Sequence, residues 1–158
     1  RNERLDLGVL AMEVVTLWLA IDNVTSENGC MRVIPGTHTL KLIDMEAAGE
    51  EAVLDKQTPP EYVEEDKAVD IVLAPGDVEV HHPNIIHGSH ANTSPNRRCG
   101  LTIRYIPTST RVTSNEPWAV ASLFHLQGKV VPGVNVYLPR PKYVESKHMP
   151  FRGCETWV

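Results

Sequence analysis

Hydrophobic and polar positions alternate along residues 13–22, and this period of two predicts a β-strand. One face of the strand would carry Val15, Leu17, Leu19 and Ile21. The other face would carry Thr16, Trp18, Ala20 and Asp22. Both faces hold apolar groups, so we expect a sheet that is covered on both sides. A turn at Asn28-Gly29 and a short strand over residues 30–34 follow, which suggests a hairpin-like pair with the first strand.

Further short strands are predicted over residues 69–73, 78–82, 85–87 and 99–106, with Gly and Pro turns such as Pro35-Gly36 between strands. Many short strands with such turns favour an all-β sandwich, barrel or jelly roll with little helix. Residues 107–158 are Pro-rich and are interpreted as an irregular tail, with one strand near 130–137.

An acidic segment, residues 41–68, interrupts the strand pattern. We expect a short helix over residues 44–54 and then an exposed loop. A solvated surface insertion is the favoured interpretation. A lid over an active site is the alternative, because long loops in compact domains often have a function.

Composition narrows the class of protein. The chain has 158 residues, which suits one domain or part of one, and its net charge of −5 weighs against nucleic acid or anionic membrane as a partner. No apolar run reaches the roughly 18 residues of a membrane span. The three cysteines, Cys30, Cys99 and Cys154, are widely spaced and indicate reduced thiols in a cytoplasmic protein.

Four histidines fall within residues 81–90, namely His81, His82, His87 and His90. Histidine is the commonest metal ligand, although single histidines are more often structural. His87 follows Ile85-Ile86 and precedes Gly88-Ser89, so it could end a buried strand and face a cavity.

Arg98 lies eleven residues after His87, at the start of an alternating strand. The same strand face would continue through Gly100, Thr102 and Arg104. A guanidinium group beside such small residues has room for a carboxylate, which it binds with two parallel hydrogen bonds. Pairing of Arg98 with a structural Asp or Glu is the alternative that spacing alone favours.

Residues 18–38 and 76–92, followed by Arg98, resemble hallmark segments of the phytanoyl-CoA dioxygenase family, and the resemblance extends over about residues 12–106. It implies a double-stranded β-helix, a cupin-like jelly roll, that uses iron(II) and 2-oxoglutarate, with ascorbate as reductant. Such enzymes bind iron through two His and one carboxylate and leave positions open for 2-oxoglutarate and molecular oxygen. The expected substrate is a small organic molecule.

The resemblance also implies roles for individual residues. His87 would be the second histidine ligand of the iron. Arg98 would bind the far carboxylate of 2-oxoglutarate, Ser89 would assist it with its hydroxyl, and Trp18 would line the pocket. His38, His82 and Asn92 also fall on family positions, where we expect scaffold roles.

The family's His-x-Asp motif, which supplies the other two ligands, normally lies shortly before the strand of Trp18. Residues 1–37 contain no His, and Asp6 is the only Asp before Trp18. Either the motif lies upstream of Arg1 or the chain has lost it. We expect the first, so residues 1–158 would be the C-terminal part of a single domain, incomplete at its N-terminus and inactive alone.

Two rival interpretations remain open. One is a non-catalytic jelly-roll binding protein that retains the 2-oxoglutarate pocket without iron. The other is a cupin-like metal protein that uses His81, His82 and His87, although neighbouring residues of a strand point to opposite faces. Substrate contacts are expected from residues 41–68 and from the tail.

Overall fold

The computed structural model describes residues 13–40, 42–49, 52, 54–113, 123–139 and 144. Its strands are β1 (Val15–Ala20), β2 (Met31–Val33), β3 (Glu46–Ala47), β4 (Lys56–Gln57), β5 (Val69–Ile71), β6 (Val78–His81), β7 (His87–Ser89) and β8 (Gly100–Tyr105). Three short 3₁₀ helices are η1 (Thr37–Thr39), η2 (Pro60–Tyr62) and η3 (Glu65–Lys67). Asp6 and Cys154 lie outside the described residues. No helix among the described residues is long and apolar enough to cross a membrane.

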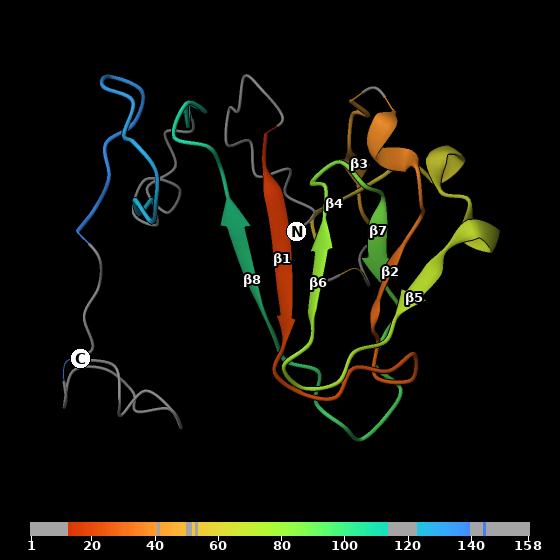
Figure 1. Ribbon diagram of the computed structural model, residues 1–158. Coiled ribbons are helices and arrows are strands. Elements are labelled where there is room, and N and C mark those ends of the chain that lie inside the picture. Colours follow the sequence, from red (N-terminus) through yellow and green to blue (C-terminus); the bar gives the residue numbers. More distant parts are fainter. Residues whose placement is uncertain are drawn as a thin grey trace.

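Two antiparallel three-stranded sheets, with strand orders β6-β1-β8 and β5-β2-β7, form the body of the molecule (Figure 1). From β5 onward the chain alternates between the sheets, so β5 and β7 lie in one and β6 and β8 in the other. This is the double-stranded β-helix, or jelly roll, and the all-β prediction is confirmed. The predicted strands over residues 13–22, 30–34, 69–73, 78–82 and 99–106 are present, with shorter bounds. The strand predicted over residues 85–87 is displaced along the chain, because β7 begins at His87 and ends at Ser89.

The hairpin expected from β1 and β2 is wrong, because the two strands belong to different sheets. Residues 21–30 carry the chain from one sheet to the other. The Asn28 side chain organises this crossing: its Oδ1 accepts from the Thr25 N–H at 2.8 Å, and its Nδ2 donates to the Asn23 carbonyl at 2.8 Å. Gly29 has φ +81°, and a Cβ there would lie 2.7 Å from the His90 carbonyl oxygen. The predicted turn is therefore confirmed, but it does not close a hairpin.

The buried core lies where the two sheets meet residues 21–30, the segment that crosses between them. Ala20, Val24 and Cys30 are at most 2% exposed, and Trp18 and Leu73 pack against them. Cys30 and Cys99 are free thiols, and burial raises the pKa of Cys30. This packing fixes β1 at the centre of its sheet, so the side chains on its inner face have defined neighbours on both sides.

The outer face of the β6-β1-β8 sheet is apolar and open among the described residues. Its exposed side chains include Val15, Ile21, Val78, Val80 and Leu101, with exposed fractions between 37% and 58%. Cover on both faces of β1 was expected from the sequence, but the described residues provide it only on the inner face.

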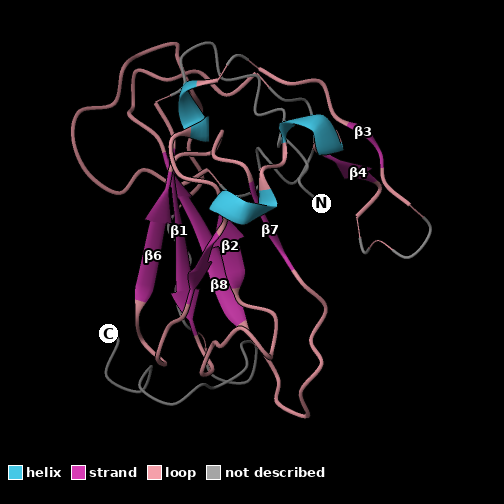
Figure 2. Ribbon diagram, turned by 90° about the vertical axis from the view of Figure 1, so that its right-hand side faces the viewer, coloured by secondary structure: helices cyan, strands magenta, loops and turns pink. Residues whose placement is uncertain are grey.

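Residues 42–68 hold no helix over 44–54 in their described part, so that expectation is wrong. Instead β3 and β4 pair, with Glu46 opposite Gln57 and Ala47 opposite Lys56. β3 and β4 lie toward one end of the sandwich, at the upper right of Figure 2. The strand expected near 130–137 is also wrong, since the structure has turns there and only a single bridge between Phe124 and Leu138.

Candidate functional site

The inner face of the β6-β1-β8 sheet carries a row of polar side chains at one end. Thr16 of β1 lies directly opposite His81 of β6 on one side and Arg104 of β8 on the other. The Thr16 side chain is 2% exposed, and its hydroxyl oxygen has no hydrogen-bond partner among the described residues. A buried hydroxyl without a partner is costly, so this position of β1 is an unusual one.

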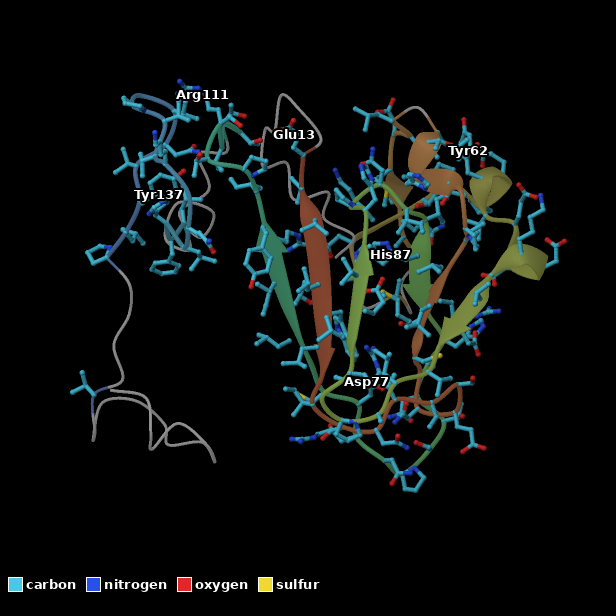
Figure 3. The ribbon with its side chains drawn as sticks, viewed as in Figure 1. Glu13, Tyr62, Asp77, His87, Arg111 and Tyr137 are labelled. Atoms are coloured by element: carbon cyan, nitrogen blue, oxygen red, sulfur yellow. The ribbon has the colours of Figure 1, made fainter. Side chains whose placement is uncertain are left out.

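His87 reaches the same space from the facing sheet, where it lies opposite Val33 of β2 (Figure 3). Its Nδ1 lies 2.8 Å from the Ile85 carbonyl oxygen. A carbonyl only accepts, so Nδ1 carries the proton and Nε2 carries the lone pair. Burial is the main cause that lowers the pKa of His87, which favours the neutral imidazole that binds metal ions.

His81 lies beside His87 across the two sheets, with ring centroids 5.1 Å apart. Its Nδ1 is 2.7 Å from Glu79 Oε2, and the two side chains are only 8% and 9% exposed. Glu79 therefore fixes the orientation of the His81 ring. The period of two in residues 78–81 already placed Glu79 and His81 on one face, but the sequence did not identify this pair.

The other histidines of the cluster lie elsewhere. The ring of His82 packs against that of His38, with centroids 5.6 Å apart, and burial lowers the pKa of His82. His90 Nε2 contacts Arg32 Nη1 at 2.7 Å. Among the described residues, no three His, Cys, Asp or Glu side chains converge as a metal site. His81, His82 and His87 are thus not brought together as one ligand set.

Arg98 stacks on the ring of Trp18, with its guanidinium carbon 5.7 Å from the ring centroid. The structural pairing that the sequence favoured for Arg98 belongs to its neighbour: Arg97 binds Asp22 through two hydrogen bonds of 2.8 and 2.9 Å. Within the described residues, no carboxylate lies within ion-pair distance of Arg98. Its guanidinium group therefore has capacity for a ligand carboxylate.

Trp18 and Ser89 lie between Arg98 and His87. Trp18 pairs with Thr102 of β8, and its ring covers the position of Gly100, where a Cβ would lie 2.6 Å from Trp18 Cη2. Ser89 is opposite Met31 and shares the face of His87. The structure thus brings Trp18, Ser89 and His87 to the inner side of the sandwich, with Arg98 beside Trp18.

The fold is that of a jelly-roll protein, with a set of polar side chains facing the space between its two sheets. The family model described as "Phytanoyl-CoA dioxygenase (PhyH)" matches residues 4–100. The chain therefore belongs to the phytanoyl-CoA dioxygenase family, whose members are oxygenases.

Several curated proteins are similar to this chain. It is 30% identical over 94 residues to the peroxisomal phytanoyl-CoA dioxygenase of Homo sapiens, which covers 58% of this chain and 28% of that protein. It is 33% identical over 144 residues to an L-proline trans-4-hydroxylase of Streptomyces griseoviridis, which covers 82% of this chain and 52% of the relative. The chain thus spans about half or less of the length of these relatives.

Solved structures agree on the fold. The non-heme monooxygenase ThoJ in its apo form is 27% identical with a TM-score of 0.65, over 86% of this chain and 48% of that one. EctD from S. alaskensis, solved with 2-oxoglutarate and 5-hydroxyectoine, is 23% identical with a TM-score of 0.50. This match covers 64% of this chain and 33% of that one. The epimerase SnoN, solved with Fe3+ and alpha ketoglutarate, is 21% identical with a TM-score of 0.51, over 84% and 48%.

Proposed function

We propose that the protein is an iron(II)- and 2-oxoglutarate-dependent dioxygenase that hydroxylates a small organic substrate. The observation that carries this proposal is the arrangement of His87 and Arg98. His87 is a neutral imidazole between the sheets, and Arg98 is a cation without a carboxylate partner among the described residues. Membership of the family supports the assignment.

His87 fits the role of one iron ligand. Its protonated Nδ1 is held by the Ile85 carbonyl, which orients the ring and leaves the lone pair on Nε2. The other two ligands would be a His-x-Asp motif upstream of Arg1. Bound iron(II) would supply the oxygen-activating redox chemistry beside His87.

The rest of the site would hold 2-oxoglutarate. Arg98 would bind its far carboxylate through both prongs of the guanidinium, while the Ser89 hydroxyl donates a further hydrogen bond. The Trp18 ring would form a wall of the pocket and keep Arg98 in place through their stacking. The positive charge of Arg98 would then bind one end of 2-oxoglutarate, and the iron would bind the other end.

The proposed reaction converts 2-oxoglutarate, molecular oxygen and a substrate C–H bond into succinate, carbon dioxide and an alcohol. Ascorbate would keep the iron reduced between turnovers. The protein's contribution is to orient the co-substrate and to exclude water from the space between the sheets. We propose a cytoplasmic location for the protein, and the free thiols of Cys30 and Cys99 among the described residues support it.

Two substitutions test the proposal in the natural protein at full length. His87→Ala should abolish succinate formation from 2-oxoglutarate and leave the circular dichroism spectrum unchanged, because the imidazole is not part of the core cluster. Arg98→Lys should raise the KM for 2-oxoglutarate about tenfold or more, because an ammonium cannot reproduce a two-pronged contact. Arg97→Lys is the matched control, since the neighbouring Arg97 already pairs with Asp22. Arg104→Lys should have a milder effect than Arg98→Lys.

Full activity of His87→Ala with iron supplied would show that His87 is not a ligand. Equal effects of Arg98→Lys and Arg97→Lys on the KM would remove Arg98 from the co-substrate site.

A non-catalytic binding protein is the second candidate, and the ligand count favours it, since the described residues offer no three-ligand metal site. Calorimetry decides between the two. The binding protein would take up 2-oxoglutarate with the same affinity with or without iron and would form no succinate. We expect residues 1–158 alone to bind iron(II) weakly and to form no succinate. Robust succinate formation by residues 1–158 would instead require substitute ligands, with His81, His82 and Asp77 the first to examine.

A further inference from the structure

A cavity lies where β8 ends. It has a volume of about 400 Å³ and separates the end of β8 from residues 123–139. Its lining includes Arg104, Tyr105, Thr108, Phe124, His125 and Tyr137. Figure 3 shows Tyr137 on this segment, which runs beside β8. The hydrogen bond from Thr108 Oγ1 to the Lys129 carbonyl, 2.7 Å long, ties the two walls together.

Arg104 joins this cavity to the row of inner-face groups. It lies opposite Thr16, whose buried hydroxyl has no partner among the described residues, and its positive charge adds to the burial that lowers the pKa of His87. Within the same described ranges, Arg104 has no hydrogen-bond or ion-pair partner. The residue is exposed as a whole, and partial burial of its guanidinium group lowers its pKa. A guanidinium group at the wall of a cavity, with no carboxylate beside it in the described residues, can bind an anion that enters the cavity.

The other lining groups indicate the body of the ligand. Apolar side chains come from Ile106, Leu123 and Leu126, and aromatic faces from Phe124 and Tyr137. Walls that combine apolar side chains with a few polar groups and one cation suit small molecules that carry a polar head. The cavity volume is also in the range of sites for small ligands, near its lower end.

The size of the cavity favours a small ligand. A volume of about 400 Å³ lies near the lower end of the range for small-molecule sites, whereas a coenzyme A thioester is a much larger molecule.

We propose that Arg104 binds the carboxylate of the substrate, and that the substrate is a small carboxylic acid with an apolar body rather than a coenzyme A thioester. The statement that this acid is the hydroxylated substrate rests on the proposed function. The carboxylate site itself can be measured independently of turnover. Arg98 would then bind the co-substrate, and Arg104 would bind the molecule to be hydroxylated.

The first experiment measures binding to the natural protein at full length, without iron. Saturation-transfer NMR follows 3-phenylpropanoate, L-proline and their amides, in an Arg98→Gln background that removes the competing carboxylate site. We expect both acids to bind and both amides to bind at least about tenfold more weakly, because a charge-assisted hydrogen bond is lost. Arg104→Gln should weaken the acids by a similar factor, and Arg104→Lys should retain part of the affinity. Lys129→Gln, which removes an exposed cation from the same segment, is the control and should change nothing.

The second experiment measures succinate formation with iron, ascorbate and 2-oxoglutarate, using the same acids and octanoyl-CoA as prime substrates. We expect at least one acid to stimulate turnover more than octanoyl-CoA does. Arg104→Gln should raise the KM for that acid at least about tenfold more than it raises the KM for 2-oxoglutarate, whereas Arg98→Lys should do the reverse.

The outcomes separate the two proposals. Absence of acid binding to the Arg98→Gln protein, equal binding of acids and amides, or unchanged binding when Arg104→Gln is added would each overturn the inference about Arg104. Preferred stimulation by octanoyl-CoA would overturn it as well. Acid binding that depends on Arg104 in a protein that forms no succinate would leave the carboxylate site standing and refute the dioxygenase function instead.

Discussion

Replacement of Gly100 by alanine tests whether the Trp18 ring is positioned as the site requires. A Cβ on Gly100 would lie 2.6 Å from Trp18 Cη2 and closer still to Cζ2 and Cε2. Real Cβ atoms almost never approach another heavy atom within 3.0 Å, so the ring must move. The indole is large and stacks on Arg98, and it cannot shift without losing that contact.

Two opposing effects set the size of the change. Glycine inside a strand is less stable than alanine by about 0.5–1 kcal/mol, so alanine without a clash would stabilise the protein. Overpacking costs about 1–3 kcal/mol, and loss of the cation–π contact adds about 0.5–1 kcal/mol. We therefore expect Gly100→Ala to destabilise the fold by about 2 kcal/mol, which lowers the Tm of a domain of this size by about 4–8 °C.

Gly88→Ala is the matched control. Gly88 also lies in a strand, but nothing lies within 4 Å of its hypothetical Cβ, so this substitution should raise the Tm slightly. Thermal unfolding followed by circular dichroism gives both Tm values, and Trp fluorescence reports the displaced ring. Trp18→Leu should relieve the clash, so the double variant should lose less stability than the two single variants together. If Gly100→Ala were as stable as Gly88→Ala, Trp18 would not occupy this position.

A buried hydroxyl, an acidic side chain and the open sheet face each support one more prediction. Thr16→Val removes a buried hydroxyl without a partner among the described residues, so we expect a gain of about 1 kcal/mol in urea unfolding, and a loss of stability would show that the hydroxyl is satisfied. The pKa of Asp70 is lowered, chiefly by the Ser26 hydroxyl, so its contribution to stability is present above the unfolded pKa of about 3.8 and is lost as the pH falls through the lower folded value. Asp70→Asn should therefore flatten the acid limb of the stability profile, and an unchanged limb would contradict this reasoning. Residues 1–158 alone should self-associate through their open apolar sheet face, so Val80→Lys should shift size-exclusion elution toward the monomer more than Val136→Lys, although Val136 is more exposed. Equal shifts for the two variants would show that self-association does not depend on this sheet face.

Local sequence patterns were enough to locate the strands and the turns between them. Alternation of side chains is a local property, so it located β1 at Val15–Ala20 and β8 at Gly100–Tyr105 within two residues. It also placed Trp18 and Thr16 on one face of β1, and it identified the turn at Gly29 because only glycine readily adopts the positive φ found there. The motif around His87 and Arg98 was sufficient to indicate the family.

The choice of which strands share a sheet, and of which polar groups meet, came from long-range packing. β1 and β2 look like a hairpin in the sequence, but β1 pairs with β6 and β8 through hydrogen bonds to residues far along the chain. The same pairing sets Thr16 between His81 and Arg104. Tertiary contacts also assign Asp22 to Arg97, which leaves the neighbouring Arg98 available for a ligand. Local periodicity gives the direction of each side chain, whereas its partner depends on register between strands, and the register is fixed only when the two sheets pack.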